Sequence, residues 1–299
     1  EQFFVFYNDQ LKVIFGKYSM KICFFTEIYY KGGLDTFLIN LFNAWPNKKD
    51  NLTLFCNESH PGITSIEKKT TRSLKIQKYN NVYASAIPEG EGKSKWGRSI
   101  IISVFIKYSY KILQYPIIFP WYVFKLMFFF RHSKFDRLMV VNGGYPASLL
   151  CRSAVIAWWL SGKRHLALMN FHNSTTSPPW YYRFFENCID KLVVRSASHI
   201  VSVSKNCLES LNRRSAFKNC NKLSYIYNGI EDPTHLLKNN LTSIENSAFL
   251  NQYCLMLGSY DPRKGHSYLL KAFQNVVKDF PNVKLKVFGY GSHYEKKIV

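Results

Sequence analysis

Lys31, Gly32 and Gly33 form a short loop with the features of an anion site. They come directly before a segment with helical spacing. Glycines let the backbone approach a ligand closely, and the free N–H groups at a helix start attract negative charge. An ordinary tight turn is the alternative interpretation of these residues. The chain has no GxGxxG sequence, which argues against nicotinamide or flavin binding.

A second loop, residues 258–266, places Arg263 and Lys264 at the predicted start of another helix. Cations beside the positive end of a helix are unfavourable unless an anion binds between them, so a bound diphosphate would explain them. Two solvated loop charges are the alternative. Gly289 and Gly291 follow a later predicted strand and would give a nucleotide-binding loop its flexibility.

His172 and Asn173 lie where an open α/β sheet binds a polar substrate. They follow the apolar run 166–171, at the carboxyl end of a predicted parallel strand. An imidazole at that place can hydrogen-bond a substrate and change its charge near neutral pH. A purely structural histidine is the alternative.

The elements that must position these loops are alternating strands and helices. Apolar residues from Leu34 onward recur at helical spacing, and the stretch 181–192 has a similar pattern. Strand, helix and strand repeated along the chain predict an α/β fold whose parallel sheet is covered on both faces, which is a Rossmann-like domain. The predicted strands are 21–25, 52–56, 74–79, 82–87, 137–141, 166–171, 200–203, 253–257 and 283–288.

The same pattern divides the chain into four parts. We expect residues 1–19 to be an extension outside the fold, because a methionine at position 20 leads directly into the first strand. Residues 20–230 are predicted to form the first Rossmann-like domain, 231–251 a polar linker, and 252–299 the start of a second Rossmann-like domain. Two strands and one helix are too few to close a core, so we expect the second domain to be incomplete.

Composition limits the classes of protein. The 299 residues are 47% hydrophobic, which excludes a disordered chain. The 40 Lys and Arg against 19 Asp and Glu give a net charge of +21, which favours an anionic partner. Seven cysteines without a CxxC pair indicate small, buried, reduced side chains of a cytosolic protein.

The segment 93–137 is basic and rich in aromatic residues. It holds nine Lys or Arg and one acid, and its longest uncharged run, 112–124, contains two prolines. That run is shorter than the roughly 20 residues that span a bilayer. We expect it to lie at an anionic membrane surface, on the cytoplasmic side of the cell membrane. A sheet-covering helix with a lysine-rich solvent face is the alternative.

Seven stretches of the sequence, in this order, resemble the family 4 retaining glycosyltransferases of the GT-B fold. The resemblance runs from about Met20 to the end of the chain. It implies two facing Rossmann-like domains with a nucleotide-sugar donor in the cleft. The stretches are KICFFTEIYYKGGLDTFLINL, FDRLMVVNGGYPAS, FHNSTTSP, HIVSVSKNCLESL, YIYNGIED, MLGSYDPRKGHSYLLKAFQNV and VKLKVFGYGS.

The resemblance implies a role for single residues. Gly33 matches the glycine that meets the donor phosphate and the acceptor, His172 the histidine that contacts the transferred sugar, and Lys264 the lysine that binds the donor diphosphate. Ser259 stands where the family usually has an arginine, so Arg263 is the candidate second cation. Further candidates for acceptor or other contacts are Gly32, Asn173 and Asn228.

The implied reaction moves a sugar, with retention, from a UDP- or GDP-sugar to an acceptor. The lysine stabilises the leaving charge electrostatically, so no metal or other cofactor is expected, and the chain has no DxD triplet. A lipid-linked saccharide in cell-surface polysaccharide synthesis, of the O-antigen or capsule kind, is the expected acceptor. The family's two-glutamate motif would follow Gly291 and is not among the 299 residues. We therefore expect this polypeptide alone to be inactive or barely active.

A catalytically inactive remnant, or a basic protein that binds membrane or nucleic acid through its charge, is the alternative function. Nucleic acid is not the expected partner, because the cations do not accompany an RNP-like strand, a zinc module or a recognition helix.

Overall fold

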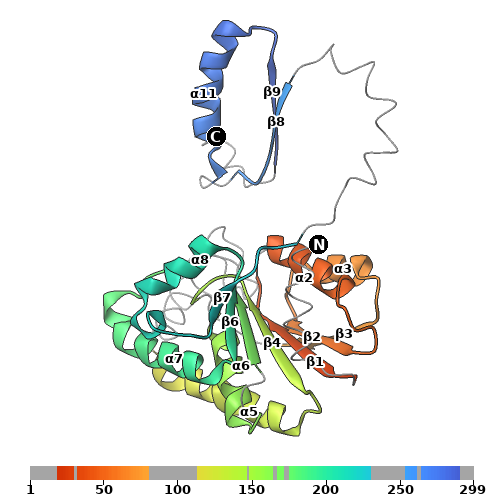
Figure 1. Cartoon of the computed structure of the whole chain (residues 1–299), viewed down its shortest axis with the longest axis vertical. Helices are drawn as coiled ribbons and strands as arrows, with labels where there is room; N and C mark the ends of the chain where they lie inside the picture. The colour runs from red at the N-terminus through yellow and green to blue at the C-terminus, as the bar shows by residue number, and fades with distance from the viewer. Residues whose placement is uncertain are drawn as a thin grey trace, which may run out of the picture. The chain divides into compact units, whose positions relative to one another are not determined.

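The computed structural model describes residues 19–29, 32–80, 113–146, 148–163, 167–171, 175–229, 253–260 and 264–289. The chain divides into two compact units, residues 1–230 and 231–299. Figure 1 shows the first unit as a sheet with helices around it, and the second as two strands beside one helix. The predicted strand 82–87 and the whole predicted linker, 231–251, lie outside the described residues.

The first unit is built on a seven-stranded sheet in the order β3-β2-β1-β4-β5-β6-β7. Every neighbouring pair of strands is parallel, which confirms the predicted α/β fold with a parallel sheet. The short strand β7 was not predicted. The strands are β1 (Lys21–Thr26), β2 (Asn51–Asn57), β3 (Leu74–Tyr79), β4 (Arg137–Asn142), β5 (Ala167–Phe171), β6 (His199–Ser202) and β7 (Leu223–Tyr225).

Helices cover both faces of this sheet (Figure 1). Helices α2 (Gly33–Asn43) and α3 (Ile63–Lys69) bury their apolar sides in one core, against β1 and β2. Helices α5 (Phe119–His132), α6 (Leu149–Leu160) and α7 (Arg183–Ser196) bury theirs in a second core on the other face. The expected two-sided cover of a doubly wound sheet is therefore present.

The first strand and first helix pack as their sequence pattern predicts. Leu38 and Phe42 of α2 are fully buried, one helical turn apart. The ring of Phe24 in β1 meets Phe42 edge-on at 4.9 Å and Trp45 at 5.5 Å between ring centroids. Such edge-to-face pairs add about 0.5–1.5 kcal/mol each beyond area burial. They fix α2, and with it the glycine loop, against β1.

Helices α5 and α6 are both apolar but differ in exposure. Helix α6 is buried on nearly every side, and the hydroxyl of Ser148 caps it by accepting the N–H of Cys151 at 3.0 Å. Helix α5 continues a π-helical turn, Gln114–Ile118, and buries only Phe119, Leu126 and Phe130. No described helix is long and apolar enough to cross a membrane.

The second unit contains the parallel strands β8 (Tyr253–Leu257) and β9 (Lys284–Phe288), joined by helix α11 (His266–Asp279). This is one β-α-β element, as predicted. Among its described residues only His266 is buried. Leu257 and Phe288 at the strand ends are more than half exposed.

The cysteines are all free, which agrees with the prediction of reduced thiols. The prediction that they are all buried is wrong at three positions, since Cys220 is only partly buried and two others are exposed. Cys188 and Cys254 are exposed, because one lies on the outer side of α7 and the other on the sparsely covered strand β8.

Candidate functional site

The strand order places a topological switch point between β1 and β4. From β1 the chain proceeds to β2 and β3 on one side, and from β4 it proceeds to β5, β6 and β7 on the other. In open α/β sheets the ligand crevice lies at the carboxyl ends of the strands beside such a point. The loops there follow Thr26 of β1 and Asn142 of β4. We call this end of the sheet the carboxyl edge.

Glu27 is the acidic residue at the switch point, directly after β1. Its carboxylate accepts hydrogen bonds from the hydroxyl of Ser148 and, at 2.8 Å, from the hydroxyl of Tyr29. Burial raises the pKa of Glu27, and these two hydrogen bonds offset part of the rise. Because Glu27 is still partly exposed, it can exchange hydrogen bonds or a proton with a hydroxyl group that reaches this end of the sheet.

Sequence reasoning missed Glu27. The available signal was an acid in the first position after a buried strand, one residue beyond the carboxyl end. Its partner Ser148 is 121 residues away in the chain, so the pairing appears only in the fold.

Two further contacts fix the start of the loop after β1. The side-chain amide of Asn57 accepts the N–H of Ile28 at 2.9 Å and donates to its carbonyl at 2.8 Å. The hydroxyl of Tyr79 donates to the carbonyl of Thr26 at 2.9 Å. Strands β2 and β3 therefore hold the backbone that leads to the glycine loop.

Gly32 and Gly33 form the start of α2. Gly32 is the N-cap, has an extended backbone and gives no side-chain cap. A Cβ atom at either glycine would meet nothing within 4 Å, so neither is required by packing against the described residues. Both glycines are exposed, so the backbone N–H groups at the start of α2 are accessible, and the anion site stays a prediction.

A network of buried ion pairs joins α6, α7 and Arg214. Arg152 of α6 donates to both carboxylate oxygens of Glu186, at 2.9 and 3.0 Å. Arg214 donates to the same carboxylate at 2.6 Å and to both oxygens of Asp190, at 2.9 and 3.1 Å. All four side chains are at most 3% exposed.

Two tyrosines complete this network. The Tyr115 hydroxyl donates to Glu186 at 2.6 Å, and the Tyr145 hydroxyl donates to Asp190 at 2.7 Å. Burial favours the neutral form of Glu186, but Arg152 and the hydrogen bonds outweigh it and lower its pKa to about 2. For Asp190 burial prevails over Arg214, and its pKa is raised.

The network anchors the base of the loop that carries His172 and Asn173. Arg214 donates to the carbonyl of Thr176 at 3.0 Å, and the N–H of Thr176 donates to the carbonyl of Tyr145 at 3.0 Å. His172 and Asn173 themselves lie outside the described residues. What the structure shows is that the loops after β4 and β5 are tied together at the carboxyl edge.

Asn228 lies in the first unit, beyond the end of β7, and is exposed. The carbonyl of the next residue, Gly229, accepts a hydrogen bond from Asn40 of α2 at 3.4 Å. The segment with Asn228 is therefore brought beside α2, the helix that starts at the glycine loop.

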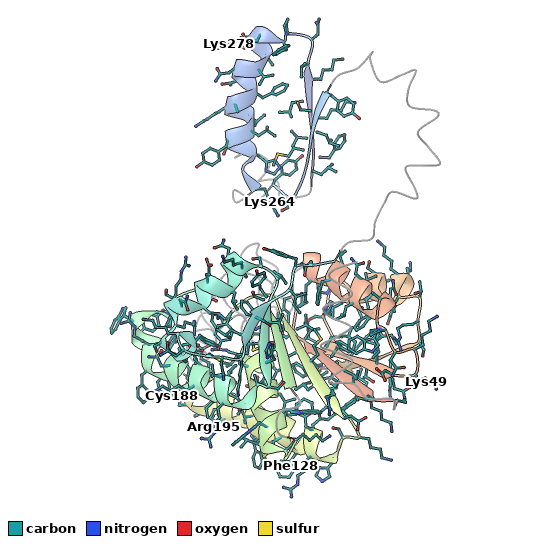
Figure 2. The ribbon with its side chains drawn as sticks, viewed as in Figure 1. Lys49, Phe128, Cys188, Arg195, Lys264 and Lys278 are labelled. Carbon is teal, nitrogen blue, oxygen red and sulfur yellow. The ribbon has the colours of Figure 1, made fainter. Side chains whose placement is uncertain are left out.

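The second unit carries the other predicted site residues at the start of α11. Lys264 is exposed, and Gly265 caps the helix with a φ of 76°, a left-handed conformation that favours glycine. Figure 2 shows Lys264 just before the first turn of α11 and Lys278 in its last turn. Arg263 and Gly291 lie outside the described residues.

The strand ends of this unit approach each other closely. Gly258 donates its N–H to the carbonyl of Phe288 at 2.9 Å, and a Cβ at Gly289 would lie 1.8 Å from the carbonyl oxygen of Gly258. Only glycine fits at position 289. Ser259, half-buried, follows Gly258 directly.

His266 was not singled out from the sequence. It is the first residue of α11 and is 2% exposed, yet neither ring nitrogen has a hydrogen-bond partner among the residues that the structure describes. Gly258 lies close to this imidazole, because a Cβ atom added at Gly258 would be 3.9 Å from the His266 ring and 3.9 Å from the Lys264 side chain. A buried imidazole without a partner is costly, and an anion at the helix start would supply an acceptor.

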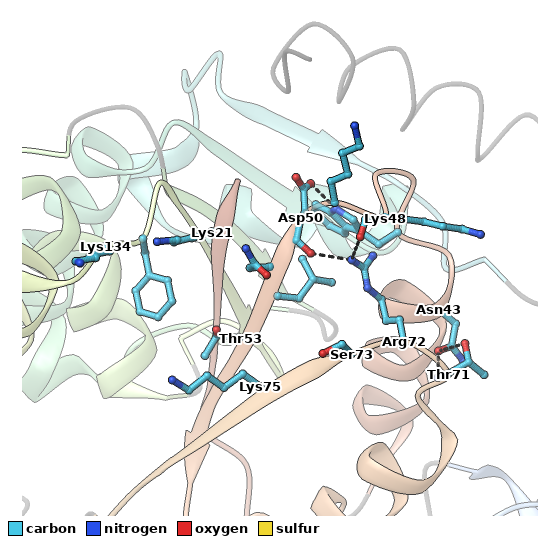
Figure 3. A pocket seen from close by; sticks show the side chains of 15 residues that line it. Lys21, Asn43, Lys48, Asp50, Thr53, Thr71, Arg72, Ser73, Lys75 and Lys134 are labelled. Carbon is cyan, nitrogen blue, oxygen red and sulfur yellow. Dashed lines mark hydrogen bonds between the residues drawn. The ribbon is translucent and has the colours of Figure 1, made fainter. Parts of the chain in front are cut away.

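A second polar surface lies at the opposite, amino-terminal end of the seven-stranded sheet, and we call it the amino edge. It surrounds an open cavity of about 780 Å³ (Figure 3). The acidic residue that lines it is Asp50, whose carboxylate accepts hydrogen bonds from the backbone N–H of Met20 and from the side chains of Trp45 and Asn47, each at 2.9 Å. The basic residues that line the cavity are Lys21, Lys48, Lys49, Arg72, Lys75 and Lys134.

Among the residues that the structure describes, the lysines of the amino edge make no ion pair with a carboxylate. No group of three or more described His, Cys, Asp or Glu side chains could hold a metal ion. The amino edge was not predicted, because its lysines are spread over several strands and turns.

Comparison with protein-family models and with curated proteins finds no match. Among solved structures, the chain is similar to MnaA from S. aureus in its structure with UDP, at 12% identity and a TM-score of 0.47, covering 93% of this chain and 64% of that one. A glycosyltransferase from Rickettsia africae matches at 12% identity and a TM-score of 0.45, covering 93% and 70%. MurG from Acinetobacter baumannii matches at 10% identity and a TM-score of 0.40, with the same coverage. Likeness at this level carries no argument about function.

Proposed function

We propose that this chain is part of a retaining glycosyltransferase of the GT-B type, which moves a sugar from a UDP- or GDP-sugar to an acceptor without a metal. The family 4 resemblance of its motifs supports the reaction class. The chain spans about 64% of the length of the S. aureus protein to which it is similar, so the activity is proposed for the whole protein.

The observation that carries this proposal is the start of α11. Three features meet there: the helix N-terminus, the exposed cation of Lys264, and the buried imidazole of His266, whose nitrogens have no hydrogen-bond partner among the described residues. All three favour an anion, and a diphosphate would take a charge-assisted bond from the lysine and a hydrogen bond from the imidazole. In the proposed reaction Lys264, with Arg263, stabilises the negative charge that develops on the leaving nucleoside diphosphate.

We propose that the first unit supplies the acceptor site at its carboxyl edge. The open glycines at the start of α2 support close approach of the donor phosphate or acceptor, and His172 is proposed to contact the transferred sugar. The partly exposed carboxyl of Glu27 is suited to accept a hydrogen bond from an acceptor hydroxyl. The proposed acceptor is a lipid-linked saccharide of cell-surface polysaccharide synthesis, reached at the inner face of the membrane.

A donor titration tests the proposal. Saturation-transfer NMR would measure binding of UDP-glucose, UDP-galactose, UDP-N-acetylglucosamine and GDP-mannose to the full chain. We expect one of these to bind, and Lys264→Ala to weaken that binding about tenfold, because a hydrogen bond to a charged group contributes about 1.5–3 kcal/mol. Lys278→Ala, at the other end of α11, is the matched control and should bind like the wild type. Absence of binding for every donor, or equal loss in both variants, would contradict the proposal.

A further inference from the structure

Five large apolar side chains form an exposed stripe along the outer side of α5 and the π-helical turn before it. The opposite side of α5 packs Leu126 and Phe130 into the core. The stripe has helical spacing, and its members are 40–60% exposed, although an apolar surface of this kind is normally covered. They are Leu113, Ile117, Trp121, Phe124 and Phe128.

Two further exposed rings lie in the 3-10 turn Trp180–Tyr182 and in the first turn of α7. Trp180 is 82% exposed and Phe184 is 73% exposed. The ring of Tyr115, in the π-helical turn, stacks on Phe185 at 5.7 Å and meets Tyr182 at a tilt at 4.7 Å between ring centroids. The π-helical turn before α5 therefore meets the start of α7 through these rings. We call the surface formed by Ile117, Trp121, Phe124, Phe128, Trp180 and Phe184 the aromatic face.

Exposed charge on these two helices is only positive. Helix α5 contains no acid, and both acids of α7, Glu186 and Asp190, are buried and paired with arginines. Because both acids of α7 are buried in this network, they add no negative charge to the exposed surface of the helix. The exposed cations of the two helices are Lys125, Arg131, Arg183, Lys191 and Arg195.

We propose that the aromatic face docks on an anionic lipid bilayer. Aromatic and aliphatic side chains enter the headgroup region, and cations around them attract acidic lipids. A second copy of the chain fits this face less well, because the cations of two copies would face each other. The inference deepens the proposed function and rests on it for the lipid-linked acceptor, although docking itself requires no sugar nucleotide.

The docking surface is also connected to the carboxyl edge. Tyr115 donates to Glu186, Glu186 binds Arg214, and Arg214 holds the carbonyl of Thr176 in the loop after β5. One buried hydrogen-bond network thus connects Tyr115 with the loop after β5. When the aromatic face is docked, this network would hold the carboxyl edge in a fixed position relative to the bilayer.

Vesicle flotation tests the docking. The full chain would be mixed with vesicles of phosphatidylcholine alone or with 30% phosphatidylglycerol, without any sugar nucleotide. We expect binding to the acidic vesicles, and a loss of at least about tenfold in the variant Trp121→Ser/Trp180→Ser/Phe184→Ser. Lys125→Glu/Arg183→Glu should weaken binding in a salt-dependent way. The matched control Tyr268→Ser/Phe280→Ser changes equally exposed rings on the second unit and should bind like the wild type.

A second measurement uses the unmodified protein. Phosphatidylcholine brominated in its acyl chains, mixed with phosphatidylglycerol, should quench tryptophan fluorescence, and Trp121→Phe/Trp180→Phe should remove most of the quenching while binding persists. Failure of the wild type to bind acidic vesicles, unchanged binding by the triple variant, or a dimer abolished by that variant would overturn the proposal. Because donor binding is measured separately, this failure is distinguishable from failure of the proposed function.

Discussion

The two edges of the seven-stranded sheet use charged residues in opposite ways. At the carboxyl edge four charged side chains are buried and each is paired with an opposite charge, and they fix the loops after β4 and β5. At the amino edge the lysines surround an open cavity without a described acidic partner. The difference shows that a charge of +21 says little about where a site is built. The loops are held in place where buried charges are paired with one another.

Breaking the buried network should give the largest effect. Arg214→Ala leaves Glu186 and Asp190 without their shared cation, and removal of one partner from a buried pair costs about 3–5 kcal/mol. Urea denaturation would measure the free energy of unfolding. Arg213→Ala is the adjacent control, since Arg213 is exposed, and it should cost less than about 1 kcal/mol. Similar losses in both variants would show that the network is not the source of rigidity.

Low pH should lower the free energy of unfolding, because it protonates Glu186 of the buried network. Its pKa is lowered to about 2 in the folded chain, so its contribution is present above its unfolded value of 4.5 and is lost as pH falls from there toward 2. The shift corresponds to about 3 kcal/mol. The difference in unfolding free energy between the wild type and Glu186→Gln should shrink over this range. A pH-independent difference would contradict the assigned pairing.

Glu27 should respond to pH with the opposite sign. Its pKa is raised in the folded chain, so ionisation destabilises the fold as pH rises above 4.5 through the folded value. Glu27→Gln removes that cost, and we expect the variant to become more stable relative to the wild type as the pH rises from 4 to 8. The comparison requires denaturation curves at several pH values. A gain toward low pH would show that the carboxylate is stabilised where it lies.

The amino edge should give the smallest effect. Lys48→Ala, Lys49→Ala and Lys75→Ala remove exposed charges, and we expect each to change the unfolding free energy by less than about 0.5 kcal/mol. A loss above about 2 kcal/mol at any of them would mean that this edge is also built from required contacts, and the contrast between the edges would fail.

The sequence predicted the elements well where one local pattern determines them. Apolar runs located the strands, and the stripe from Leu34 located α2. Strand order was not predictable, because it depends on crossovers between distant segments. Strand β7 has only three residues, so its apolar signal is weak.

The candidate site was predictable only in its glycine loops and in Lys264. Arg152 lies within an apolar helix, and its partner Glu186 is 34 residues away, so no local pattern indicates their pair. Glu27 and His266 became candidates only when burial and hydrogen-bond partners were known.

Hydrogen exchange with mass spectrometry tests most directly whether ligand binding belongs to the carboxyl ends of the strands. The full chain would be compared with and without a saturating UDP- or GDP-sugar. The proposed function predicts slower exchange in residues 258–266, with the amino-edge segments 45–53 and 71–75 unchanged. Protection at the amino edge, or no change in 258–266 with the donor bound, would contradict it.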